Sequence, residues 1–156
     1  MKTTKVLLLI FLLFVAIKSS GCELTVQVME YPPLAIKDAE GNWSGVNIDY
    51  IDALFKKANC QYNLFETPFD RGLKLLETGD INFALNISKL KVRENYLHFI
   101  GPQRNETIRF VSRKEQLPMI HSWQELAALD AVLIRQRGAY LGKEVEQIYN
   151  TKKILS

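Results

Sequence analysis

The sequence has few of the residues that build metal centres and nucleophilic active sites. Its 156 residues include only two histidines and two cysteines. His98 and His121 stand apart from other ligand types, without the spacing of a metal site. Serine, histidine and aspartate do not occur in an order and context typical of a hydrolase, and there is no internal repeat. We therefore expect no metal, no cofactor and no enzymatic activity.

An excess of positive charge is also missing once the first residues are set apart. The formal net charge is +3, and Lys2, Lys5 and Lys18 account for all of it, because no acid lies among the first 20 residues. The rest of the chain is neutral and has no basic stripe interleaved with aromatic residues. Nucleic acid is therefore not expected as a partner.

The one long apolar run lies near the N-terminus. Val6–Ile17 is an unbroken apolar stretch of 12 residues, preceded by Lys2 and Lys5 and followed by small and polar residues before Cys22. A membrane-spanning helix needs about 20 apolar residues. We therefore predict a cleaved secretory signal over residues 1–21 and a periplasmic location. An uncleaved N-terminal anchor is the alternative.

The two cysteines, Cys22 and Cys60, each stand immediately before a predicted strand. If the two strands are parallel neighbours, their first residues lie side by side, and an exported protein can oxidise the pair to a disulfide. Lipid attachment at Cys22 is an alternative, because Ser20 and Gly21 suit a lipoprotein cleavage site, although Ser19 stands where leucine is usual. Two free thiols are the third possibility.

Strand and helix patterns alternate along the rest of the chain. Apolar runs and alternation predict strands over 24–29, 61–66, 81–87, 108–112 and 131–135. Apolar residues at helical spacing predict helices over 47–58, 68–78 and 91–99, after the capping box Ser122–Glu125, and from Gly138 onward. This alternation predicts an open, mostly parallel α/β sheet.

Three segments that follow strands should meet at one edge of this sheet. Ligands of open α/β sheets bind at the carboxyl ends of strands, which here are followed by 30–33, 67–70 and 86–88. Ser88 and Arg93 add a hydroxyl and a guanidinium near the start of the third predicted helix. The free N–H groups and dipole of a helix start attract anions. This arrangement favours capture of a small carboxylate-bearing solute.

Six short motifs carry a resemblance to a known family: Tyr31–Leu34, Gly45–Asp49, Pro68–Arg71, Gly79–Asn82, Ser88–Phe99 and Arg135–Gly138. In order and spacing they resemble bacterial extracytoplasmic solute-binding proteins of family 3, the polar-amino-acid class of ABC importers. The resemblance implies a type II periplasmic-binding-protein fold with two α/β lobes. It implies a first lobe over 22–104, a hinge crossing at 105–107 and a partial second lobe over 108–156.

The resemblance also implies roles in binding the solute. Asn86 and Ser88 would donate to its carboxylate, and Arg93 would be its main ion partner. Tyr31 would be the aromatic wall of the pocket and Phe69 an apolar contact. Gly138, with Ala139 and Tyr140, would face the solute from the second lobe. Simpler interpretations stay open: a solvated charge at Arg93, a strand end at Tyr31, a core residue at Phe69 and a helix cap at Ser88.

Some positions depart from the family pattern. Leu90 and Val92 replace polar residues near the expected site, and Ala139 stands where threonine is usual. Family members are also about one and a half times as long as this chain. The length of this chain is closer to that of one typical domain than to that of two. We therefore expect a chain truncated within the second lobe, with a non-functional fragment as one outcome.

The sequence thus predicts an exported, monomeric solute-binding protein. It would deliver a small carboxylate-bearing solute, such as a polar amino acid, to an inner-membrane ABC permease. One alternative is a dehydratase-like periplasmic enzyme on the same scaffold, with Glu30 or Asp70 as its acid or base. For Asp70, however, we expect a salt bridge to Arg71 or Lys74 and no catalytic role. A ligand-sensing domain is the other alternative.

Overall fold

The protein is described here by a computed structural model that covers residues 21–113 and 119–151. The predicted secretory signal therefore lies outside the described residues, except for Gly21. In chain order the elements are β1 (Cys22–Val28), β2 (Ile36–Lys37), β3 (Trp43–Ser44), α2 (Val46–Ala58), β4 (Cys60–Glu66), α3 (Phe69–Thr78), β5 (Phe83–Ala84), the 3-10 turn η1 (Arg93–Asn95), α4 (Trp123–Ala128) and α5 (Lys143–Thr151). No described helix is long and apolar enough to cross a membrane.

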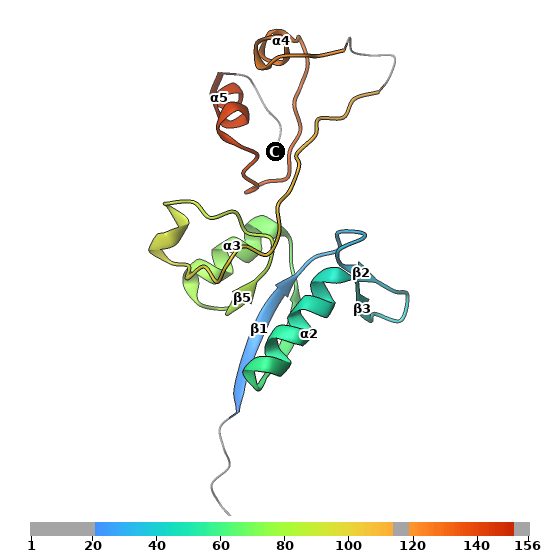
Figure 1. Ribbon diagram of the computed structural model, residues 1–156, viewed down its shortest axis with the longest axis vertical. Helices are drawn as coiled ribbons and strands as arrows, with labels where there is room; N and C mark the ends of the chain where they lie inside the picture. Colours follow the sequence, from blue (N-terminus) through green and yellow to red (C-terminus); the bar gives the residue numbers. More distant parts are fainter. Residues whose placement is uncertain (1–20, 114–118, 152–156) are drawn as a thin grey trace, which may run out of the picture.

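Three parallel strands in the order β4-β1-β5 form the main sheet. The central strand β1 pairs with β4 along its whole length, from Cys22 opposite Cys60 to Val28 opposite Glu66. β5 pairs with the other edge of β1, and β2 and β3 form a separate antiparallel pair. Figure 1 shows α2 and α3 against this sheet, with α4 and α5 in a separate upper part. The predicted α/β class with a parallel sheet is confirmed.

The core lies where α2 packs on the sheet. The apolar spacing of α2 buries Ile48, Ile51 and Phe55 on one side, as its sequence predicts. The Phe55 ring lies 5.3 Å from that of Tyr62 and 5.2 Å from that of Phe83, measured between centroids. Burial of one apolar face contributes most of a helix's stability in a protein. The α2 packing therefore holds all three strands of the sheet.

Gly45 fixes the start of α2 against the loop after β1. Its φ is +107°, and a Cβ there would lie 2.7 Å from the Leu34 carbonyl oxygen. Only glycine tolerates both this conformation and this close approach. The Asn47 N–H also donates to the Leu34 carbonyl, at 2.9 Å. The first turn of α2 and the loop after β1 are therefore joined at the edge of the sheet where a ligand was expected.

Two predicted elements of the first half are shorter than expected. The strand predicted over 81–87 is reduced to β5, because the side chain of Asn82 accepts the N–H of Thr25 at 2.8 Å and Asn86 has a left-handed φ of 60°. The helix predicted over 91–99 is wrong, since only the single turn η1 forms. Val92 is 66% exposed there, while the polar Arg93 is buried. A segment that buries no apolar face gains little from becoming helical.

The two strands predicted in the second half are also wrong. Residues 108–112 and 131–135 contain no strand in the structure. Both carry the apolar, β-branched residues typical of strands, but Val111 is 93% exposed and Ile134 is 80% exposed. β-propensity leads to a strand only where a partner strand and a packed face are present. Ile134 forms no more than an isolated bridge, and neither segment has a partner strand among the described residues.

The helices of the second half agree better with the sequence. The capping box predicted at Ser122–Glu125 is confirmed, because the Ser122 hydroxyl accepts the Glu125 N–H at 3.1 Å. α5 buries Val145 and Ile148, as predicted. It begins at Lys143 and not at Gly138, because Gly138 and Gly142 both have positive φ, which an α-helix excludes.

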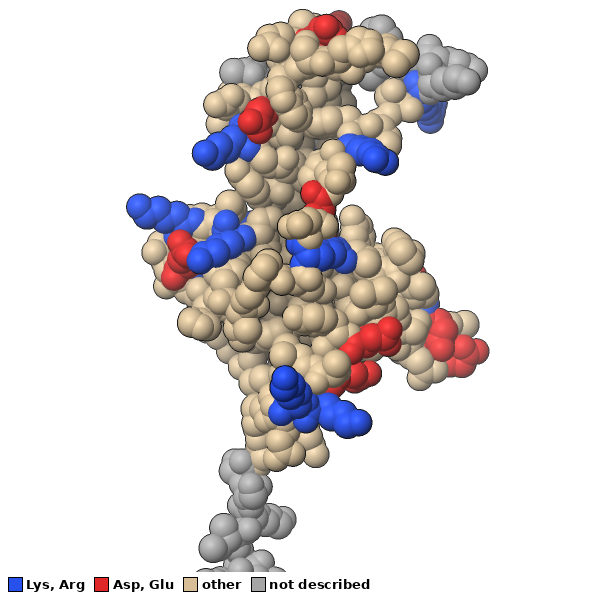
Figure 2. All heavy atoms as spheres, viewed as in Figure 1, with Lys and Arg blue, Asp and Glu red and all other residues tan. Residues whose placement is uncertain are grey.

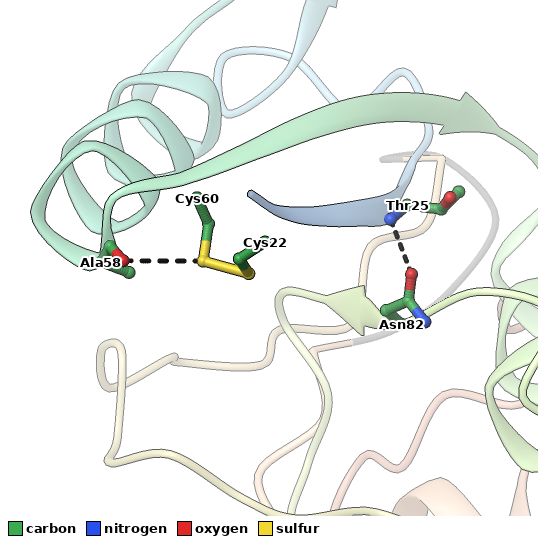
Figure 3. Close-up of a disulfide and its surroundings, with 5 residues drawn as sticks. All are labelled: Cys22, Thr25, Ala58, Cys60 and Asn82. Carbon is green, nitrogen blue, oxygen red and sulfur yellow. Dashed lines mark hydrogen bonds between the residues drawn. A yellow bond between two sulfur atoms is a disulfide. The ribbon is translucent and has the colours of Figure 1, made fainter. Parts of the chain in front are cut away.

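Cys22 and Cys60 form a disulfide across the first register position of β1 and β4. Figure 3 shows the pair, with the Cys60 sulfur also near the Ala58 carbonyl and the Thr25–Asn82 bond close by. A sulfur in a disulfide cannot also carry a thioether-linked lipid. Lipid attachment at Cys22 would therefore require this disulfide to be absent.

Candidate functional site

A pocket of about 140 Å³ opens at the carboxyl ends of the three parallel strands. This is smaller than the roughly 300–1,000 Å³ of pockets for drug-sized ligands, so it suits a small solute. It is lined by residues from β1 and its following loop, α2, α3, the segment after β5 and the second half of the chain: Gln27, Val28, Met29, Tyr31, Ala35, Asn47, Ile51, Phe69, Leu85, Asn86, Ser88, Glu106, Ile108, Gln136, Ala139, Tyr140 and Leu141.

The end of β1 and the start of α3 are tied together by Gln27. This side chain is 7% exposed, and its Nε2 donates to the Thr67 carbonyl at 2.9 Å. The Thr67 N–H in turn donates to the Val28 carbonyl at 3.0 Å. Gly72 allows this contact, because a Cβ there would lie 2.7 Å from Cγ of Gln27. These contacts hold Phe69, in the first turn of α3, at the pocket.

Tyr31 reaches the pocket on a tight loop. Its N–H donates to the Ala35 carbonyl at 2.8 Å, and its own carbonyl accepts the N–H groups of Leu34 and Ala35. Tyr31 is 53% exposed and lines the pocket. The Tyr–Pro–Pro sequence thus ends β1 and also places an aromatic ring at the site.

Asn86 and Ser88 follow β5 and both line the pocket. The left-handed φ of Asn86 turns the chain out of the strand, a conformation that asparagine tolerates better than most residues. Ser88 does not cap a helix, because the helix predicted after it is absent. Its carbonyl accepts a hydrogen bond from Nη1 of Arg93 at 3.0 Å.

Arg93 lies beside the pocket without lining it. Its side chain points inward, since the residue is 6% exposed, and Nη2 donates to the Gly138 carbonyl at 2.6 Å. Burial lowers the pKa of Arg93, and the neighbouring Tyr96 partly opposes this effect. An arginine stays protonated in a protein, so the site keeps a buried positive charge held between two backbone carbonyls.

The segment around Gly138 closes the pocket from the second half of the chain. The Gln136 amide contacts the Met29 sulfur at 3.2 Å, and Arg137 lies 3.9 Å from Asp70. Gly138 packs on α3, since a Cβ there would lie 3.1 Å from Leu73. The structure therefore brings Tyr31, Phe69, Asn86, Ser88 and Tyr140 to one pocket, with Arg93 and Gly138 bonded behind it.

Several lining residues were not found from the sequence. Gln27 occupies a polar position in the alternation of β1, which indicates a solvent-facing residue, yet it is buried. Asn47 is also buried, and its Oδ1 accepts from the Gln103 amide at 3.3 Å. Glu106 and Gln136 come from segments without regular structure. The sequence signal for two of them was their place in the motifs Gly45–Asp49 and Arg135–Gly138, which contain Asn47 and Gln136.

The acids considered for an enzyme lie elsewhere. Neither Glu30 nor Asp70 lines the pocket. The expected bridge from Asp70 to Arg71 or Lys74 is wrong, because Arg137 is its ion partner, while Lys74 pairs with Glu77. Among the described residues no three histidine, cysteine or acidic side chains are grouped to hold a metal. Figure 2 shows basic and acidic residues in small separate groups on the face drawn.

Residues 24–151 match the family of bacterial extracellular solute-binding proteins, family 3. The match spans most of the chain, including the pocket and the buried arginine. The chain belongs to this family. No curated protein sequence matches it, so the assignment depends on the family match and on its fold.

Solved structures show the family's type II periplasmic-binding-protein fold. An ancestral amino acid-binding protein, described as a precursor of cyclohexadienyl dehydratase, is 20% identical with a TM-score of 0.67, over 92% of this chain and 63% of that one. An ancestral arginine-binding protein bound to glutamine is 22% identical with a TM-score of 0.64, over 85% and 59%. A putative ABC-transporter binding component from Wolinella succinogenes, complexed with lysine, is 19% identical with a TM-score of 0.62, over 86% and 58%. The chain thus spans about 60% of the length of these solved structures.

Proposed function

We propose that this family 3 chain captures a small polar solute, such as an amino acid with its carboxylate, outside the cytoplasm and delivers it to an ABC permease as a monomer. The observation that supports this proposal is the convergence of Tyr31, Phe69, Asn86, Ser88 and Tyr140 on one small pocket at the carboxyl ends of the parallel strands. The predicted secretory signal supports the periplasmic location.

In this proposal the solute carboxylate binds at the end of the pocket where Asn86, Ser88 and Arg93 lie. The amide of Asn86 and the hydroxyl of Ser88 can both donate to it. Arg93 already donates to the carbonyls of Ser88 and Gly138. A carboxylate binds a guanidinium more strongly than a neutral carbonyl does, and in a bidentate geometry. The solute carboxylate would therefore take the place of the Gly138 carbonyl.

Closure around the solute is the second part of the proposal. We place a first lobe over 22–104, the crossing at 105–107 and part of a second lobe from residue 108 onward. The segment around Gly138 would move against α3 when the two lobes close, as in hinge closure around a ligand. No chemical step is included, because neither Glu30 nor Asp70 lies at the pocket.

Isothermal titration calorimetry with a panel of amino acids tests the function. At least one member should give a saturable heat, and Ser88→Ala and Asn86→Ala should each weaken its binding about fivefold or more, since each removes a hydrogen bond to a charged group. Ser112→Ala is the matched control, because Ser112 is exposed and away from the pocket. Absence of heat with every member, from a chain shown to be folded by circular dichroism, would contradict the proposal.

A further inference from the structure

The pocket has an unexpected charge. Glu106 is the one residue with a full charge among those that line it. No lysine or arginine reaches the lining, because Arg93 lies behind it with two of its nitrogens bonded to backbone carbonyls. The lining therefore contributes one carboxylate, which is ion-paired with Arg104 through one of its oxygens, and no cation, whereas the sequence predicted a cation at the site.

We propose that Glu106 is the residue that determines solute specificity, by binding a positively charged group on the side chain of the solute. The solute would then be a small cation that carries an alkylammonium or guanidinium group in addition to the groups of an amino acid. This inference rests on the proposed function, because it concerns the same pocket. The proposed function leaves open which residue selects among amino acids, and the present inference assigns that selection to Glu106.

The contacts of Glu106 leave it available to a ligand. Arg104 donates to it through Nε at 3.0 Å and through Nη2 at 2.5 Å, and both bonds go to the same oxygen, Oε1. Arg104 does not line the pocket, so it binds Glu106 from outside. Among the described residues nothing bonds to Oε2. The Glu106 side chain is 50% exposed, which leaves room for a cation at this oxygen.

Aromatic rings complete a cation site. Tyr31, Phe69 and Tyr140 line the same pocket and come from three different parts of the chain. The face of an aromatic ring attracts an ammonium or guanidinium group. A carboxylate together with aromatic faces favours a cation over an anion of the same size, and it also favours a cation over a neutral isostere, because only the cation gains the charge interaction.

The test compares L-lysine with L-norleucine, which lacks the side-chain ammonium of lysine and is otherwise nearly the same shape. Binding of both is measured by calorimetry for the unaltered chain and for Glu106→Gln. The unaltered chain should prefer lysine, and the substitution should reduce the lysine-to-norleucine affinity ratio about five- to tenfold, with norleucine binding nearly unchanged. Glu77→Gln is the matched control, because Glu77 is an ion-paired acid outside the pocket.

A second variant separates the charge of Glu106 from its ion pair. Arg104→Gln also breaks the bond to Arg104 but keeps the carboxylate, so the lysine-to-norleucine ratio should stay the same or rise. An equal loss of that ratio in Arg104→Gln and Glu106→Gln would overturn the assignment, because it would show that the ion pair shapes the pocket. An unchanged ratio in Glu106→Gln would overturn it too.

The two proposals fail in different ways. Saturable binding of norleucine or glutamine with no preference for lysine would overturn the role of Glu106 and leave the solute-binding function supported. An equal weakening of lysine and norleucine by Glu106→Gln would place the carboxylate against the α-ammonium, which contradicts side-chain selection. Absence of binding to every amino acid would contradict both the function and the specificity.

Discussion

Nη2 of Arg93 donates a 2.6 Å hydrogen bond to the carbonyl of Gly138, which lies 45 residues later in the chain. This bond joins the segment after β5 to the segment that closes the pocket from the second half. It also places a neutral oxygen on the guanidinium that the family resemblance assigns to the solute carboxylate. The same arginine thus serves the fold and, in our proposal, the ligand.

Arg93→Lys should therefore lower the affinity for the solute while the protein stays folded. Lysine keeps the charge but cannot present the planar, bidentate donors of a guanidinium. We expect a loss of at least tenfold in solute affinity, measured by calorimetry, with circular dichroism unchanged. Arg71→Lys, on the exposed side of α3, is the control. Equal affinities in Arg93→Lys and the unaltered chain would show that Arg93 holds the backbone only.

Gly138→Ala should destabilise the protein more than Gly79→Ala does. Both glycines have nearly the same positive φ, +79° and +82°, so both substitutions cost about 1–2 kcal/mol in backbone strain. A Cβ at position 138 would also lie 3.1 Å from Cδ1 of Leu73, whereas a Cβ at position 79 has no heavy atom within 4 Å.

Urea denaturation measures this difference, since a change in midpoint at constant slope reports stability. The Gly138→Ala midpoint should lie below that of Gly79→Ala, and only Gly138→Ala should also weaken solute binding, because only its segment closes the pocket. Equal midpoints and equal affinities for the two variants would show that the segment around Gly138 does not pack on α3 in solution.

The first half of the fold could be predicted from the sequence because its signals are local and agree with one another. α2 has a regular apolar face, an acid in its first turn and lysines in its last turn. β1 and β4 have the apolar and alternating patterns of strands, and the parallel order follows from the helices between them. The edge where Tyr31 and Phe69 meet follows from that order, since ligand sites form at the carboxyl ends of parallel strands.

The strands and the pocket contacts of the second half could not be predicted in this way, although its helices could. Residues 108–112 have the composition of a strand, but a strand forms only when another strand supplies hydrogen-bond partners. The contribution of Glu106 and Gln136 to the pocket depends on how the chain returns to α3, which no local pattern encodes. The bond from Arg93 to the Gly138 carbonyl could not be predicted for the same reason, because the two residues are remote in sequence.

The disulfide should contribute strongly to stability. Cys22 and Cys60 are 38 residues apart, and closing a loop of that size in the unfolded chain is worth about 4 kcal/mol in the chain-entropy treatment. The double variant Cys22→Ser with Cys60→Ser should lower the free energy of unfolding by roughly this amount in urea denaturation. The unaltered chain in reductant should match it, and no change on reduction would contradict the pairing.

Stability should also fall at high pH through Tyr62. Burial and the neighbouring Asp52 raise the pKa of Tyr62 to about 12, above its ordinary value of 10.0, and its hydroxyl donates to the Asp52 carboxylate. A raised pKa means that the folded state favours the neutral phenol. The contribution is fully present below pH 10 and is lost as the pH rises towards 12, because the unfolded chain then gains more from ionisation.

Urea denaturation between pH 8 and pH 12 measures this loss. Tyr62→Phe should be less stable than the unaltered chain at pH 8, since it lacks the bond to Asp52, and should lose less stability as the pH rises, since it has no phenol to ionise at that position. Tyr50→Phe controls for the general effect of one fewer tyrosine, because Tyr50 is 42% exposed on α2. Parallel pH profiles for Tyr62→Phe and the unaltered chain would show that Tyr62 titrates alike in the folded and unfolded states.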